Sequence, residues 1–186
     1  MILQLKIQIK GISKPPVWRR LLVPDQFTFH RLHNIIQAAF GWEDYHLYQF
    51  SPKGYGSPLH IGLEDDEWAD EDLISAKKAK LKDYLGQKGT TFTYIYDFGD
   101  DWTHRILVEE VIDGKAIRAE LLAGKGACPP EDCGGVWGYE DMKEALKDPA
   151  HDMHDELREW LGLEKGEAWD AQSFDLEAAK VAVSSV

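Results

Sequence analysis

The first ten residues alternate between apolar and polar side chains. Leu3, Leu5, Ile7 and Ile9 would face one side of an extended chain, and the intervening Gln and Lys residues would face the other. This period of two is typical of a strand that is buried on one face and exposed to water on the other. It lacks the basic start and continuous apolar run of a signal peptide. The pattern therefore predicts an antiparallel strand and, with no export signal, a cytoplasmic protein.

A helical period follows. Thr28 can cap a helix whose apolar side chains recur every three or four residues from Leu32 to Phe40, and Gly41 is suited to end it. Further apolar patterns predict strands at residues 18–23, 45–50, 90–96, 102–112 and 115–122. Helices are expected at residues 81–85, 139–147, from 148 to about 161, and 173–183.

The connections suggest how these elements are arranged. Asp113-Gly114 is a strong two-residue turn signal, so residues 115–122 are expected to return beside residues 102–112 as a hairpin. An acidic loop is expected at residues 64–72. Strands come in consecutive groups and the later helices follow them, which favours an α+β fold with a mostly antiparallel sheet. A length of 186 residues fits a single domain spanning 1–186.

Charge narrows the classes of partner. The formal net charge is −12, so phosphate backbones and anionic membrane surfaces would repel the chain as a whole. Non-specific nucleic-acid binding and membrane association are therefore not expected. In a reducing cytoplasm the two cysteines, Cys128 and Cys133, are not expected to form a structural disulfide.

The segment YIYDFGDDWTH, residues 94–104, holds the first candidate site. Asp97, Asp100 and Asp101 crowd around Gly99, and extended geometry would place Trp102 and His104 on one face of the following strand. The acids could hold a cation or a cationic ligand, or they could cap backbone amides in a tight turn. The kinase reading of Asp-Phe-Gly is excluded because no catalytic loop or glycine-rich phosphate loop accompanies it.

The segment CPPEDCGG, residues 128–135, holds the second candidate site. Two thiolates four residues apart can share a zinc ion, with His46, His104, His151 or His154 as candidates for the remaining ligands. The alternative is a rigid Pro-Gly loop carrying two small buried thiols.

Four motifs in this order resemble one family. They are PVWRR at 16–20, the LH, IQ and FGW positions of residues 32–42 with His46, the YxYDFGDxWxH segment, and CPPEDCGG with Gly138 and Tyr139. Together they resemble the plasmid pRiA ORF-three-like family, which implies a compact α+β domain. Members often carry a transposon-resolvase label and occasionally a methyltransferase label. This acidic chain shows neither a basic DNA-binding segment nor a glycine loop for a methyl-donor cofactor.

These observations lead to three hypotheses. The first is a binding or adaptor module whose pocket combines His46, Asp97, Asp100, Trp102, His104 and the loop at 128–135, with a small polar molecule, a peptide or a metal ion as ligand. His104 would be its titrating group, with a pKa raised by Asp97 or Asp100. The second is a metal-dependent hydrolase with Cys128 and Cys133 as zinc ligands and Asp100 or Glu131 as base. The third is a nucleic-acid accessory protein of a mobile element.

Overall fold

The first strand, β1 (Ile2–Ile9), lies inside the sheet of the computed structural model, which describes residues 1–64 and 73–186. Leu3, Leu5, Ile7 and Ile9 are fully buried, and the polar residues between them are partly exposed. The predicted alternation is therefore confirmed. Most of the acidic segment at 64–72 falls outside the described residues.

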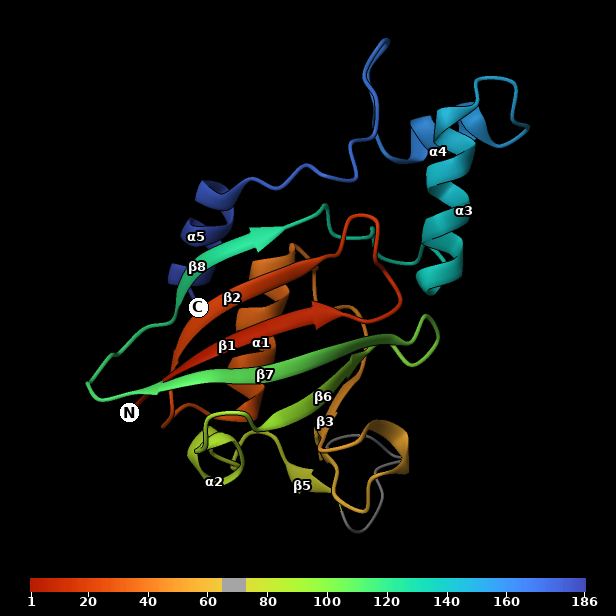
Figure 1. Cartoon of the computed structure of the whole chain (residues 1–186). Helices are drawn as coiled ribbons and strands as arrows, with labels where there is room; N and C mark the ends of the chain where they lie inside the picture. Colours follow the sequence, from red (N-terminus) through yellow and green to blue (C-terminus); the bar gives the residue numbers. More distant parts are fainter. Residues whose placement is uncertain (65–72) are drawn as a thin grey trace.

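The described residues form one eight-stranded sheet in the order β5-β4-β3-β6-β7-β1-β2-β8 (Figure 1). Besides β1, its strands are β2 (Trp18–Pro24), β3 (Tyr48–Ser51), β4 (Ile61–Gly62), β5 (Ile74–Ser75), β6 (Thr91–Tyr96), β7 (Trp102–Ile112) and β8 (Glu120–Lys125). All neighbouring pairs are antiparallel except β4 and β5, which are parallel. The fold is α+β with a mostly antiparallel sheet, as predicted.

Helix α1 (Phe29–Phe40) forms for the reasons read from its sequence. The side chain of Thr28 accepts a hydrogen bond from the amide of Arg31, and Gly41 ends the helix with a φ of 86°. Glycine adopts this left-handed conformation at little energetic cost, because it has no Cβ. The apolar face of α1 packs into the main core of the molecule, where Phe29 contacts Phe50 edge to face.

The remaining helical segments are η1 (Gly54–Gly56), α2 (Leu81–Leu85), α3 (Gly135–Lys147), α4 (His154–Trp160) and α5 (Leu176–Ser184). Helix α5 runs beside β8, whereas α3 and α4 stand away from the sheet (Figure 1). The side chain of Asp175 caps α5 by accepting from the amide of Ala178. None of the helices in the described part of the chain is long and apolar enough to cross a membrane.

The prediction of a hairpin at Asp113-Gly114 is wrong. Strand β8 pairs with β2, because the edge of β7 that would receive it is already paired with β1. Residues 113–119 lead the chain past β1 and β2, and β8 begins only at Glu120.

Other predicted boundaries also shift. Strand β3 begins at Tyr48 and not at residue 45, and α3 begins at Gly135 and not at residue 139. Helix α4 begins at His154, several residues after the predicted start at 148, and none of its residues is fully buried. The prediction that its apolar side chains face the core is therefore wrong in part, since Met153 and Trp160 remain 42% and 49% exposed.

Candidate functional site

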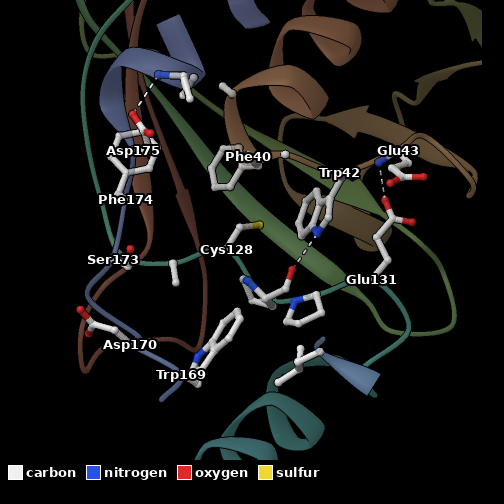
Figure 2. Close-up of a pocket in the computed structure, with 18 of the residues that line it drawn as sticks. Phe40, Trp42, Glu43, Cys128, Glu131, Trp169, Asp170, Ser173, Phe174 and Asp175 are labelled. Atoms are coloured by element: carbon white, nitrogen blue, oxygen red, sulfur yellow. Dashed lines mark hydrogen bonds between the residues drawn. The ribbon is translucent and has the colours of Figure 1, made fainter. Parts of the chain in front are cut away.

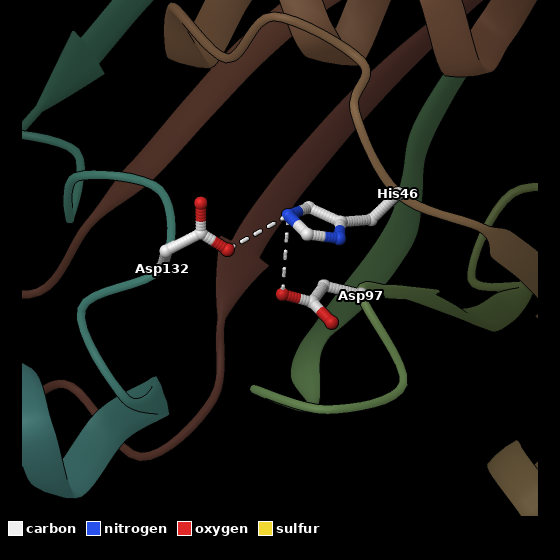
Figure 3. Close-up of side chains that lie close together, drawn as sticks. All are labelled: His46, Asp97 and Asp132. Atoms are coloured by element: carbon white, nitrogen blue, oxygen red, sulfur yellow. Dashed lines mark ion pairs between the residues drawn. The ribbon is translucent and has the colours of Figure 1, made fainter.

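The imidazole of His46 lies in a cluster of carboxylates. His46 follows α1 in the segment that leads to β3, and its side chain is partly exposed. Its Nε2 lies 3.0 Å from Oδ1 of Asp132, 3.6 Å from Oδ2 of Asp97 and 3.9 Å from Oε2 of Glu131. Figure 3 shows His46, Asp97 and Asp132 pointing toward one another from three separate segments of the chain. We call His46, Asp97, Glu131 and Asp132 the His46 cluster.

The turn after β6 fixes the carboxylate of Asp97. Oδ1 accepts a hydrogen bond from the amide of Gly99 at 2.8 Å, which leaves Oδ2 as the oxygen that faces His46. The amide of Asp97 donates to the carbonyl of Leu47, which ties this turn to the segment that carries His46. Asp97 has a φ of 57°, a conformation that Asp tolerates better than most residues. Capping the turn and facing the cluster are thus done by two different oxygens of one side chain.

Glu131 is held in the same way. Its Oε1 accepts from the hydroxyl of Tyr96 at 2.9 Å and from the amide of Glu43 at 2.8 Å. Its Oε2 is buried, has no hydrogen-bond partner within the described residues and faces His46. Burial, followed by the bond to Glu131, raises the pKa of Tyr96, so this hydroxyl remains a proton donor at neutral pH.

The two motifs singled out in the sequence meet in space. Oδ2 of Asp100 accepts from the amide of Gly134 at 3.0 Å, which joins the turn after β6 to the loop at 128–135. A Cβ on Gly135 would lie 2.4 Å from the carbonyl oxygen of Asp100, so this close approach requires glycine. The same contact brings Glu131 and Asp132 to the end of β6.

His104 and Trp102 lie in the core and are not members of the His46 cluster. Both are almost completely buried, and the ring of His104 contacts Phe40 and Trp42 edge to face. Its Nδ1 lies 2.7 Å from the carbonyl of Trp102; since a carbonyl only accepts, Nδ1 carries the proton. Burial lowers the pKa of His104 to about 3. The expectation that nearby carboxylates would raise this pKa is wrong, because His104 is desolvated and hydrogen-bonded to backbone.

The cysteines do not join a ligand group. Among the described residues, the only His, Cys, Asp and Glu side chains with three ligand atoms within 4.8 Å of one another are those of His46, Asp97 and Asp132. Burial raises the pKa of both thiols, that of Cys133 to about 12, so in the absence of a metal ion both are protonated at neutral pH. The geometry therefore provides no cluster for a zinc site built on Cys128 and Cys133.

The other candidate histidines are used locally. Nδ1 of His151 accepts from the amide of Met153, and Nδ1 of His154 lies 3.0 Å from the carbonyl of Ala145. These contacts shape the connection between α3 and α4. Neither residue belongs to the His46 cluster.

A groove of about 910 Å³ adjoins the His46 cluster (Figure 2). Phe40, Trp42, Trp169 and Phe174 line it, and Glu131 belongs both to the groove and to the cluster. The indole nitrogen of Trp42 donates to the carbonyl of Pro129 at 2.9 Å, which anchors the loop against the end of α1. The groove has a volume within the range of small-molecule pockets.

Arg19 forms part of the groove's floor and explains one sequence motif. The residue is 1% exposed and donates to the carbonyls of Trp18, Ala39, Lys125 and Gly126. Its guanidinium lies between the rings of Phe40 and Phe174, 4.8 Å and 3.7 Å from their centroids. Burial lowers its pKa to about 10, so it is still charged at neutral pH. Arg19 therefore ties β2 to α1 and to the end of β8.

Sequence reasoning named His46 and Asp97 as pocket residues, but it missed Asp132 as their partner. Asp132 lies inside the motif at 128–135, directly before Cys133, which was predicted as a zinc ligand. The available signal was the pair Glu131-Asp132 itself, because adjacent acids in a Pro-Gly-rich loop are suited to face a common site.

The fold and the site together define a class of protein: an α+β domain that carries a His-carboxylate cluster where three loops meet. The chain belongs to the plasmid pRiA4b ORF-3-like protein family, whose model matches residues 1–178. It is 41% identical over 162 residues to the uncharacterized protein y4hQ of Sinorhizobium fredii, a match covering 87% of this chain and 81% of the relative.

A solved structure shares the fold. The crystal structure of the protein of unknown function MM3350 from Methanosarcina mazei Go1 matches with a TM-score of 0.76 and 40% sequence identity. The match covers 95% of this chain and 96% of that one. Family and fold are thus established, and the names of these two proteins assign them no activity.

Proposed function

We propose that this protein is a binding module whose His46 cluster holds a divalent transition-metal ion such as Zn²⁺ or Mn²⁺. His46, Asp97 and Asp132 would supply three ligands and Glu131 a fourth. The observation that carries the proposal is the convergence of three ligand atoms within 4.8 Å from segments distant in the sequence. One imidazole with carboxylates suits these ions better than Ca²⁺, which takes oxygen ligands.

The electrostatics of the cluster support a cation. Three carboxylates face one imidazole nitrogen, so even a protonated ring would supply one positive charge against three negative ones. A divalent ion supplies two and can contact several of these oxygens at once. Like charges brought this close repel one another unless something pairs with them.

The hydrogen bonds around the cluster support a prearranged site. Asp97 and Glu131 each use one oxygen for a fixed hydrogen bond and keep the other directed at His46. Outer hydrogen bonds that orient ligands in this way are a regular feature of metal centres. The adjoining groove would place an organic ligand beside the ion, consistent with a binding role.

Calorimetric titration of chelator-treated protein tests the proposal. Asp97→Asn removes one charge and keeps the side-chain shape, and Asn also tolerates a positive φ. We expect Zn²⁺ or Mn²⁺ to bind at one site and Asp97→Asn to weaken binding at least ~30-fold, because even changes to residues that only orient the ligands typically cost about 10- to 100-fold in metal affinity.

Asp101→Asn is the matched control, because Asp101 lies in the same turn with a φ of 53° and outside the ligand group. We expect this control to bind the ion within about threefold of the original affinity. A wild-type protein that gives no saturable signal, or equal losses in both variants, would contradict the proposal.

A further inference from the structure

The pair of helices that stands away from the sheet carries a second concave surface. A groove of about 640 Å³ lies between α3, α4 and the loop at Asp132 and Cys133; we call it the α3–α4 groove. Met142, Met153, Leu157 and Trp160 supply its apolar lining. Of these, only Met142 is fully buried, and Met153 and Trp160 are nearly half exposed.

Packing within the fold accounts for only part of this apolar lining: Met142 and Leu157 contact the core, whereas Met153 and Trp160 remain exposed. Helix α4 has no fully buried residue, and Figure 1 shows it on the outer side of the molecule. Apolar side chains gathered in one open groove are characteristic of surfaces that receive another molecule. Methionine in particular adapts its shape to different apolar partners, because its side chain is unbranched and flexible.

The charge around the groove has one sign. The charged side chains in its lining are Asp132, Asp141, Glu144 and Glu156, and the lining contains no lysine or arginine. Glu144 forms a surface ion pair with Lys147, but Asp141 and Glu156 form none within the described part of the chain. Residues 135–160 as a whole hold eight acidic and three basic side chains.

We propose that the α3–α4 groove docks a basic amphipathic peptide segment of another protein. Apolar side chains of the segment would contact Met153, Leu157 and Trp160, and its Lys or Arg residues would pair with Asp141 and Glu156. This mode is the recognition of an amphipathic helix by an apolar groove. The proposal does not rest on the metal site, with which it shares only Asp132.

The acidic side chains of the α3–α4 groove argue against nucleic acid, a membrane or a second copy of this chain as the occupant. Nucleic acid and anionic membranes carry the same sign of charge as these side chains and would be repelled. A second copy of this chain brings a net charge of −12 to the contact. A basic partner gains from the same field, both in affinity and in the rate of encounter.

Three labelled model peptides of equal length test the proposal by fluorescence anisotropy with the full chain. They are an amphipathic Leu/Lys peptide, a Ser/Lys peptide of equal charge, and a Leu/Glu peptide. We expect saturable binding of the Leu/Lys peptide and at least ~10-fold weaker binding of the others, because apolar contact and charge are both required. Equal binding of the Ser/Lys peptide, or no binding of Leu/Lys at about 1 mM, would overturn the proposal.

Two double variants locate the binding surface. Asp141→Asn with Glu156→Gln is expected to weaken Leu/Lys binding at least ~10-fold, which corresponds to about 1.4 kcal/mol. Asp113→Asn with Glu120→Gln removes the same charge at the end of β7 and the start of β8, outside the groove, and is expected to change binding less than about twofold. Equal losses in both, or a concentration-dependent dimer in sedimentation velocity, would overturn the proposal.

Discussion

At the residue scale, the pattern of β7 decides what Trp102 and His104 do. The prediction that they share a face is confirmed, but this is the face that also carries Ile106 and Val108 and is buried. The sequence held this signal, because four alternate positions that include two aliphatic residues indicate a core face. The structure accordingly packs the imidazole of His104 among aromatic rings. The exposed His46 in a loop could be associated with its carboxylates only once the chain was folded.

Two buried histidines make the stability depend on pH. Burial lowers the pKa of His33 to about 4 and that of His104 to about 3, against about 6.5 in an unfolded chain. Below pH 6.5 the unfolded chain takes up protons that the folded chain does not, so the free energy of unfolding falls until the folded pKa values are reached.

We predict that urea unfolding between pH 6.5 and 4.5 shows this fall, with up to about 1.4 kcal/mol per pH unit from each histidine. His104→Phe should remove its share of the slope, whatever it does to the stability at pH 7. His151→Phe, at an exposed position, should leave the slope unchanged. An unaltered slope in His104→Phe would contradict the prediction.

At the element scale, local signals determined some elements and not their neighbours. Helix α1 could be predicted from Thr28 to Gly41 because both ends are set by local hydrogen bonding and backbone conformation. The pairing of β8 with β2 could not be predicted, because an alternating pattern indicates a strand without identifying the strand beside it. The start of α3 was missed because it depends on a tertiary contact between Gly135 and Asp100.

This contact yields a prediction. Gly135 has a φ of +67°, and a Cβ there would meet the carbonyl oxygen of Asp100 at 2.4 Å. Gly135→Ala should lower the free energy of unfolding by more than about 2 kcal/mol, because a backbone clash adds to the cost of the left-handed conformation. It should also weaken metal binding, since it displaces the loop that carries Asp132.

The matched control is Gly166→Ala, where φ is +87° and nothing lies within 4 Å of the added Cβ. Here only the conformational cost applies, which is about 1 kcal/mol. Urea unfolding followed by circular dichroism measures both variants. If the two substitutions cost the same, the close approach of the turn and the loop does not stabilise the fold.

At the scale of the whole molecule, a bound ion would join three loops that are otherwise distant in the sequence. A ligand that binds only the folded chain stabilises it by about 2.7 kcal/mol at a concentration of 100 times its Kd. For a chain of this size we expect the cognate ion to raise Tm by roughly 5–10 °C. Excess chelator should reverse the shift in differential scanning fluorimetry.

Charge screening must be separated from specific binding, because the chain has a net charge of −12. NaCl at matched ionic strength and Asp97→Asn with the cognate ion are the two controls, and neither should reproduce the shift. A similar rise with NaCl would show that the ion acts through general screening.

The position of β1 has a consequence for the growing chain on the ribosome. Strand β1 is made before both of its partners. One of its edges pairs with β2, which follows soon after, but the other edge pairs with β7, which begins at Trp102. While the intervening residues are synthesised, β1 presents unpaired backbone donors and acceptors next to a row of apolar side chains. Such an edge is a template for pairing with other chains. A nascent chain that stalls before Trp102 is therefore expected to depend on chaperones in a way that the completed protein does not.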